Sequence, residues 1–415
     1  MAIIKAFKGF RPRPAIAGQL ASRPYDVLNT AEAREEVQGN PHSFLHVVKP
    51  EIDLPESMSP YDDQVYTTGR DNFLKLVEKG DMVQDEMPAL YVYRQQMDGQ
   101  YQSGLVAAAA VADYLSGVVK KHELTRPDKE EDRRKHVRVS GINAEPVFFA
   151  YPAVDEIDEI VSQVQKDEPV YDFVAEDGIG HTLWVIQDMA TIARLEQLFA
   201  EKVPFTYIAD GHHRTAAAAG VGEEKQQANA AHTGQELYNY FMAVHFPDDQ
   251  LRIIDYNRVV KDLNGLSETE FLAKVGENFD VEAIEGQYKP DQLHHLGLYL
   301  NGSWYRLEAH EGTYDDSDPV GVLDVSILSA QILAPILDIV DLRRDKRIEF
   351  VGGIRGLGEL EKRVDSGEMK LAFALYPVSM QQLINISDTD NIMPPKTTWF
   401  EPKLRSGLVV YQFEG

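Results

Sequence analysis

The stretch Tyr207-Ile208-Ala209-Asp210-Gly211-His212-His213-Arg214-Thr215 decides how the rest of the chain is interpreted. An apolar run at 203–209 leads into it, and four consecutive alanines at 216–219 follow it before Gly220 and Gly222. Apolar residues, an Asp-Gly pair and then a helix-forming run predict a strand, a tight turn and a short helix that ends at the two glycines.

The predicted turn and the start of the helix carry the candidate catalytic and phosphate-binding residues: Asp210, Gly211, His212, His213, Arg214 and Thr215. Backbone N–H groups without a partner and the helix dipole make the first turn of a helix attractive to anions. One carboxylate, two imidazoles and a guanidinium supply acid/base groups, metal ligands and a phosphate clamp. If the Asp-Gly pair only capped the helix, Asp210 would be needed, but His212, His213 and Arg214 would have no role. We therefore expect a phosphate site here.

Composition limits the classes of function. The 415 residues are too many for one typical core, so two or three domains are expected. A net charge of -26 opposes binding to DNA or to an anionic membrane. The sequence has no cysteine, which excludes disulfides, thiolate catalysis and cysteine metal sites. We find no signal-peptide pattern and no apolar run of membrane-spanning length, so a cytoplasmic protein is expected.

The order of predicted elements indicates an α/β protein (α+β, with mixed sheets). The first half mixes hairpins with helices and lacks the strict strand-helix repeat of a Rossmann sheet. A polar stretch at 222–234 predicts a boundary between an N-terminal domain, 1–233, and a C-terminal α/β domain, 234–415. In the second domain, Asn301-Gly302 predicts a β-hairpin, and the apolar residues 325–339 predict a buried helix.

A second candidate site lies at His122-Glu123-Leu124-Thr125. The zinc-protease helix needs a second histidine one turn later, where Arg126 stands, and Pro127 interrupts a continuous helix. We therefore reject a zinc site. Glu123 ends an apolar lead-in and is a candidate general base at the mouth of a cleft, although the charges that follow are equally typical of a solvated helix face.

Two proline-containing segments offer additional site contacts. Pro24 stiffens the loop that holds Arg23, Tyr25 and Asp26, which is typical of a site-lining loop or of a plain structural loop. Three prolines at 394–402 hold Lys396 and Thr397 in an extended segment, either as a lid that contacts phosphate or as a rigid packing arm. The sequence leaves both pairs of alternatives open.

These motifs together resemble a family of uncharacterised bacterial and archaeal proteins known as domain of unknown function 1015. The resemblance rests on Arg-Pro-Tyr-Asp-Val at 23–27, the His122 motif, Ala-Asp-Gly-His-His-Arg at 209–214 and Met-Pro-Pro-Lys-Thr-Thr from residue 393. The Asp-Gly-His-His-Arg segment is also similar to that of SerK-like free serine kinases, which share a fold with ParB partition proteins and sulfiredoxin. This second resemblance implies a ParB/sulfiredoxin-like nucleotide site in the first half.

The resemblance implies phosphoryl transfer from ATP or ADP to a hydroxyl of a small metabolite, with free serine as the expected acceptor. Asp210 would orient a histidine or hold Mg²⁺, His212 and His213 would contact phosphates or shuttle a proton, and Arg214 would neutralise charge. Glu123 would take the proton, although it matches the kinases' catalytic glutamate only as an upstream carboxylate. The alternatives are a nucleotide-switched binding protein of ParB type without kinase activity and a metal-dependent phosphoesterase. No DNA or membrane partner is expected, and a homodimer is possible.

Overall fold

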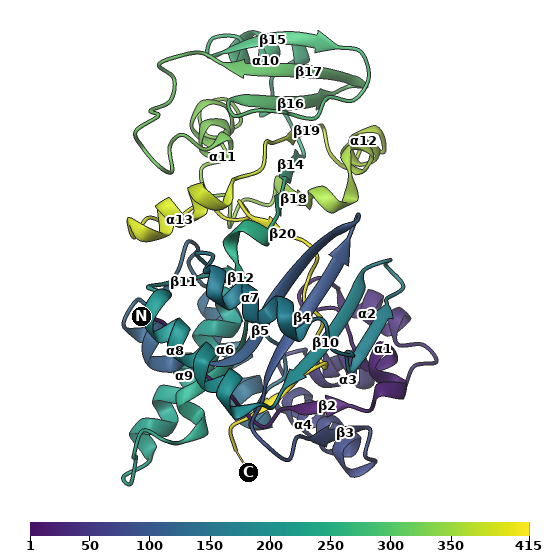
Figure 1. Cartoon of the computed structure of the whole chain (residues 1–415). Coiled ribbons are helices and arrows are strands. Elements are labelled where there is room, and N and C mark those ends of the chain that lie inside the picture. Colours follow the sequence, from purple (N-terminus) through teal and green to yellow (C-terminus); the bar gives the residue numbers. More distant parts are fainter. Residues whose placement is uncertain (415) are drawn as a thin grey trace. The chain divides into compact units, whose positions relative to one another are not determined.

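The chain forms two units in the computed structural model, which describes residues 1–414 (Figure 1). The first unit comprises Met1–Leu251 together with the chain from Pro402 onward, and the second comprises Arg252–Glu401. This division differs from the expected boundary between residues 233 and 234. The strand β12 (Tyr240–Pro247), which lies after that boundary, pairs with β5 (Gln100–Ala110) and β8 (Val147–Tyr151) inside the sheet of the first unit.

The first unit contains a mixed sheet with the strand order β6-β11-β8-β12-β5-β4-β10-β9, and β1 adds to β5. The pairs β11/β6 and β12/β8 are parallel and the other pairs are antiparallel. This confirms the expected mixed α/β class. The bounds of the other strands in this unit are β1 Ile4–Lys5, β2 Phe10–Pro12, β3 Met82–Gln84, β4 Leu90–Met97, β5 Gln100–Ala110, β6 Val119–Lys120, β7 Ile142–Asn143, β8 Val147–Tyr151, β9 Tyr171–Val174, β10 Gly180–Ile186, β11 Thr206–Asp210 and β21 Tyr411–Gln412.

Helices pack on this sheet through apolar side chains. Leu195 and Phe199 of α8 join Ile157 of α7 and Trp184 of β10 in one buried cluster. The N-terminal helices form another cluster, in which Phe44 and Phe73 are buried. The bounds of the helices are α1 Ala17–Leu20, α2 Thr30–Glu36, α3 Leu45–Val48, α4 Asp63–Glu78, α5 Val111–Leu115, α6 Pro127–Ser140, α7 Asp155–Val164, α8 Met189–Lys202 and α9 His212–Ala228.

The helix α9 is longer than the sequence predicts. It runs for 17 residues and passes through Gly220 and Gly222, which were expected to end it. Both glycines lie against neighbours: a Cβ on Gly220 would lie 2.5 Å from the Arg134 guanidinium, and one on Gly222 would lie 2.6 Å from the Tyr238 carbonyl oxygen. These two glycines therefore serve close packing, and the helix continues because its contacts outweigh their low propensity.

The second unit is built on an antiparallel sheet with the strand order β15-β17-β16-β19-β14-β18. The predicted hairpin is confirmed, since β16 and β17 join at Asn301 and Gly302, which both have positive φ. The predicted helix at 325–339 is only partly right, because a π-helical turn at Ser329–Leu333 follows the short α11. The bounds are β13 Ile253–Ile254, β14 Tyr256–Val260, β15 Phe279–Ile284, β16 His295–Leu300, β17 Ser303–Ala309, β18 Ile348–Gly352, β19 Leu371–Ala374, β20 Trp399–Phe400, α10 Glu268–Val275, α11 Asp324–Leu328, α12 Leu357–Asp365 and α13 Met380–Asp388.

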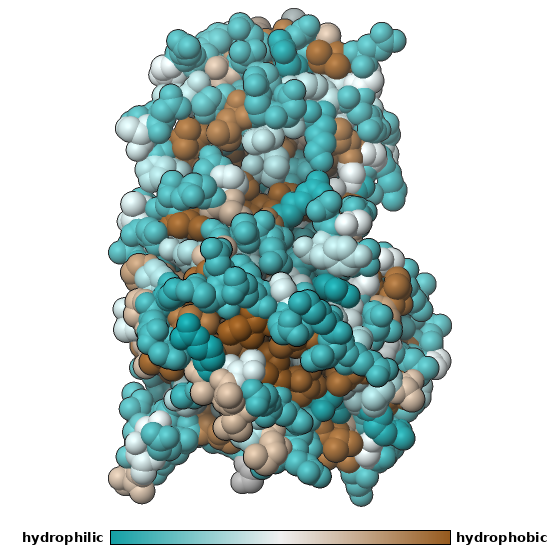
Figure 2. All heavy atoms as spheres, viewed as in Figure 1, coloured by the Kyte–Doolittle hydropathy of each residue, from teal (hydrophilic) through white to brown (hydrophobic). Residues whose placement is uncertain are grey.

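The surface is described by its hydropathy. The face drawn in Figure 2 is mostly hydrophilic, with a hydrophobic area over the first unit. Within the described chain, no helix combines the length and the apolar character that crossing a membrane requires.

Candidate functional site

The predicted strand, turn and helix are present around Asp210. The strand β11 ends at Asp210, Gly211 is the N-cap, and α9 begins at His212. Gly211 has a φ of 94°, which side chains disfavour, and a Cβ there would lie 3.0 Å from the Arg214 Nε. The turn therefore depends on glycine at this position.

Arg214 points inward beneath this turn. One guanidinium nitrogen donates to the Pro146 carbonyl oxygen at 2.6 Å and the other contacts Asp210 Oδ2 at 3.3 Å, while Nε has no hydrogen-bond partner among residues 1–414. Burial lowers the pKa of Arg214, but the carboxylates of Asp26, Asp210 and Glu145 outweigh it and raise that pKa above its usual value. The side chain is thus a fixed cation inside the protein, where the sequence suggested a clamp open to phosphate.

Two histidines pack against each other at the start of α9. The rings of His122 and His212 meet edge to face with their centroids 4.5 Å apart, and both side chains are buried. Burial lowers the pKa of His122 to about 4, against the opposing effect of Asp210. Burial and the neighbouring His122 lower the pKa of His212 well below its usual range. Both imidazoles are therefore neutral at neutral pH and act as donors and acceptors, without positive charge.

His213 fastens a loop to the helix. Its Nε2 accepts a hydrogen bond of 3.0 Å from the Arg126 N–H. The loop between β6 and α6 carries the half-buried Glu123 and also Thr125, whose hydroxyl donates to Glu130 Oε2 at 2.7 Å. Because β6 runs parallel to β11, this loop leaves the sheet at the end where β11 delivers Asp210. The structure thus brings the two predicted motifs to one place.

Lys403 joins the site from the end of the chain. Its Nζ lies 3.4 Å from Asp210 Oδ2, across a separation of 193 residues. Gln95 fixes the backbone of this segment by donating to the Lys403 carbonyl oxygen at 2.8 Å. The sequence analysis missed Lys403, although it singled out the proline segment, because nothing in the sequence says that the chain returns to the first unit after Pro402.

A buried polar chain anchors the returning segment. The Arg405 Nε donates to His181 Nε2 at 3.1 Å, and the other ring nitrogen of His181 bonds the Tyr93 hydroxyl at 2.7 Å. Arg405 also forms an ion pair with Asp177. Burial and the Arg405 charge lower the pKa of His181 to about 3, so its ring stays neutral and can accept from Arg405. These contacts hold Lys403 in position.

The predicted loop near the N-terminus lies beside the buried charge of Arg214. The Tyr25 N–H donates to Glu145 Oε1 at 3.1 Å, and the Arg133 guanidinium lies 4.0 Å from the centre of the Tyr25 ring. Burial raises the pKa of Glu145, against the effects of Arg214 and Arg133. Arg23, by contrast, forms an ion pair with Glu36.

A small cavity lies behind the turn, among these charges. Its volume is about 30 Å³, which is room for about one water molecule. Arg133, Glu145 and Arg214 are among the side chains that line it. This space is therefore part of the interior and is too small for a nucleotide.

The comparison with known proteins places the sequence in a family. A family described as "Protein of unknown function (DUF1015)" matches residues 4–326. The chain belongs to this family. No curated protein matches it by sequence.

Several solved structures resemble this member of the family at low identity. A conserved hypothetical protein from Pyrococcus furiosus has 14% identity and a TM-score of 0.36, over 73% of this chain and 93% of that chain. A free serine kinase in complex with AMP has 13% identity and a TM-score of 0.35, over 72% and 86%. SbnI from Staphylococcus aureus, with a C-terminal truncation, has 8% identity and a TM-score of 0.39, over 72% and 85%.

The remaining predicted contacts belong to the second unit of this DUF1015 chain. Lys396 Nζ lies 5.8 Å from the centre of the Tyr256 ring, and the Thr397 hydroxyl donates to the Pro394 carbonyl oxygen at 2.6 Å. Their contact with phosphate stays a prediction. Among residues 1–414, no group of three or more histidine, aspartate or glutamate side chains is placed to hold a metal ion.

Proposed function

We propose that the Asp210 turn binds nucleotide phosphates and that the protein transfers a phosphoryl group to the hydroxyl of a small metabolite. The observation that carries this proposal is the approach of Lys403 Nζ to Asp210 Oδ2, at 3.4 Å, beside the first turn of the 17-residue helix α9. The chain end supplies a cation where a helix dipole already favours anions. Arg214 adds a second cation beneath the turn, at 3.3 Å from the same carboxylate oxygen.

A phosphate group would replace Asp210 as the main partner of Lys403. Its oxygens would accept from the first N–H groups of α9 and from Lys403 Nζ, because charge-assisted hydrogen bonds are the stronger kind. Asp210, released from Lys403, would be left facing the phosphates with its half-exposed carboxylate. Arg214 would keep its place, since it bonds the Pro146 carbonyl oxygen and is buried.

Mg²⁺ would bind at this site only together with the phosphates of the nucleotide. A bound Mg²⁺ usually keeps several waters and takes one or two carboxylates together with substrate phosphates. Asp210 is the carboxylate that would hold it, in exchange for its contacts with Lys403 and Arg214. When bound, the ion would neutralise developing charge on the phosphates.

Glu123 is the proposed general base. It lies in the loop that His213 fastens to α9 through the Arg126 N–H, so its backbone is held near the turn. Its half-buried carboxylate would accept the proton of the attacking hydroxyl. His122 and His212 would orient the reacting groups as neutral imidazoles, because burial keeps their pKa values low.

A nucleotide-controlled binding protein without transfer is the second candidate. It is favoured by the inward position of Arg214 and by the bond of His213 to Arg126, which commit two of the four polar side chains to structure. In this case the turn would bind phosphate, and the loop at 121–126 would respond to it.

The test is incubation with ATP or ADP, Mg²⁺ and a panel of hydroxyl metabolites that includes free serine, with mass spectrometry of the products. We expect a phosphorylated acceptor, and Glu123→Gln should lower turnover by about a hundredfold or more while nucleotide affinity stays nearly intact. Glu131→Gln is the matched control on the exposed side of α6. Full turnover in Glu123→Gln would show that the base lies elsewhere, and tight nucleotide binding without any product would favour the second candidate.

A further inference from the structure

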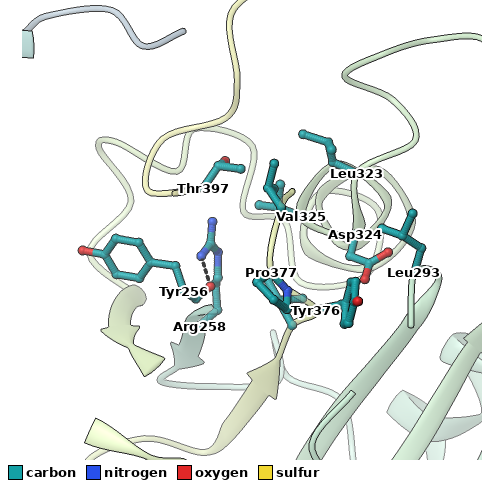
Figure 3. A pocket seen from close by; sticks show the side chains of 11 residues that line it. Tyr256, Arg258, Leu293, Leu323, Asp324, Val325, Tyr376, Pro377 and Thr397 are labelled. Atoms are coloured by element: carbon teal, nitrogen blue, oxygen red, sulfur yellow. Dashed lines mark hydrogen bonds between the residues drawn. The ribbon is translucent and has the colours of Figure 1, made fainter. Parts of the chain in front are cut away.

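A second cavity lies within the second unit, away from α12. The helix α12 packs on β14, β16 and β19, and Val259 faces it in a buried cluster. Because side chains alternate along a strand, Arg258 points to the opposite face of the sheet. Figure 3 shows this face, where α11, the end of β19 and the segment at 394–397 enclose a narrow space.

Arg258 lines this space and is buried without an acidic partner among residues 1–414. It is fully buried, and its guanidinium donates to the Tyr256 carbonyl oxygen and, at 3.2 Å, to the Pro395 carbonyl oxygen. The ring of Phe350 lies 5.0 Å from the guanidinium carbon. Within residues 1–414, no carboxylate forms an ion pair with Arg258, and its Nε has no hydrogen-bond partner.

The protein therefore keeps a cation in an environment that opposes its charge. Burial lowers the pKa of Arg258 to about 9, with Tyr256 acting in the opposite direction. The guanidinium is still charged at neutral pH. Burying a charge without a counter-ion is costly, and this cost is recovered when an anion enters and satisfies the remaining donor.

Asp324 lies on another wall of the cavity. Its Oδ1 accepts from the His294 N–H at 2.7 Å, while the buried Oδ2 has no hydrogen-bond partner in the described chain. In Figure 3 the Asp324 side chain comes from α11, with Val325 and Pro377 between it and Arg258. Arg258 and Asp324 thus line one cavity without forming an ion pair with each other.

The remaining walls are apolar. They are formed by Leu293, Leu323, Val325, Leu375, Pro377 and Val378, together with Tyr376 and Thr397. The space is closed in this structure: its volume is about 10 Å³, which is no more than one water molecule needs, so a ligand enters only when a wall residue moves. Leu293 is the most exposed of these residues, at 36%, so it separates the space from solvent.

We propose that this cavity binds a small aliphatic carboxylate, with Arg258 as its counter-ion. The planar guanidinium matches the two oxygens of a carboxylate, and the apolar walls suit a short hydrocarbon chain. In its ionised form Asp324 repels a dianion such as phosphate more strongly than it repels a monoanion. The site is independent of the nucleotide turn, since all its residues belong to the second unit.

The probes are propionate and butyrate, with chloride and phosphate at matched ionic strength as comparison anions. Ligand-observed NMR on the full chain should show saturable binding of the two carboxylates at millimolar concentration and at least tenfold weaker binding of chloride and phosphate. A parallel rise of the unfolding temperature is expected, because a ligand of the native state stabilises it.

Variants separate this account from a purely structural arginine. Arg258→Lys keeps the charge and loses the planar fork, so the affinity for butyrate should fall at least tenfold. Arg343→Lys makes the same change at an exposed position and should leave binding unchanged. Lys403→Met should also leave it unchanged, which distinguishes this site from the proposed nucleotide site.

Three results would overturn the proposal. The first is the absence of saturable carboxylate binding to the wild-type chain, a measurement that needs no variant. The second is equal binding of butyrate by the wild type and by a folded Arg258→Lys variant. The third is equal affinity for chloride and butyrate, which would make Arg258 an unselective anion contact.

Discussion

Arg214 and Arg258 are both buried arginines, yet they lie in opposite electrostatic environments. Around Arg214, the carboxylates of Asp26, Asp210 and Glu145 raise its pKa despite burial. Arg258 has carbonyl oxygens and aromatic rings as neighbours, and burial lowers its pKa to about 9. The difference shows that burial alone does not set the state of a charged group. The partners decide whether the charge stabilises the fold or is kept at a cost.

The largest expected effect comes from removing each arginine. Arg214→Met would remove the buried cation that Glu145 and Asp210 share and leave them only Arg133 and Lys403, so the free energy of unfolding should fall by about 3–5 kcal/mol. Arg258→Met removes a charge that lacks a counter-ion, and only the hydrogen bonds to two carbonyl groups are lost, so we expect a loss of about 1 kcal/mol. Urea denaturation of both variants measures the loss of unfolding free energy. Equal losses in the two variants would contradict the expected difference between Arg214 and Arg258.

Asp324 extends the comparison to a carboxylate without a cation. Burial raises its pKa to about 7, against the N–H groups of His294 and Tyr376. The folded state therefore binds more protons than the unfolded state between pH 3.8 and about 7, and stability falls as the pH rises through this window. Asp324→Asn should raise the free energy of unfolding by up to about 4 kcal/mol at pH 8 and change it little at pH 4. A constant difference at the two pH values would contradict this account.

His122 should show the opposite dependence on pH in the first unit. Burial lowers its pKa to about 4, so the unfolded state binds more protons between about pH 4 and 6.5. Its contribution to stability is complete above pH 6.5 and is lost as the pH falls. His122→Phe keeps a ring against His212 and should remove about 3 kcal/mol of this acid-induced loss. Denaturation curves at pH 7 and pH 4.5 test it, and an unchanged acid-induced loss in the variant would count against a buried neutral His122.

The sequence was most informative where structure is local. The Asp210-Gly211 turn and the Asn301-Gly302 hairpin depend on backbone conformations that only a few residues adopt, and both were predicted. The length of α9 was not, because the packing of Gly220 and Gly222 against Arg134 and Tyr238 is invisible without the fold.

Contacts between residues far apart in the sequence could not be predicted either. The approach of Lys403 to Asp210 spans 193 residues and requires the chain to return to the first unit after Pro402. The expected boundary at residue 233 followed composition, whereas β12 belongs to the sheet before it. No signal in the sequence distinguished the fully buried Arg258 from an ordinary strand residue.

The most direct test of the central claim is calorimetric titration of ATP, ADP and AMP into the wild-type chain and into Lys403→Met. We predict binding by the wild type, and a loss of affinity of at least about tenfold in Lys403→Met, or about 1.4 kcal/mol. Lys8→Met, at an exposed lysine of the same unit, should leave the affinity unchanged. The absence of binding by any of the three nucleotides, or equal affinity in the wild type and Lys403→Met, would contradict a phosphate site at Asp210.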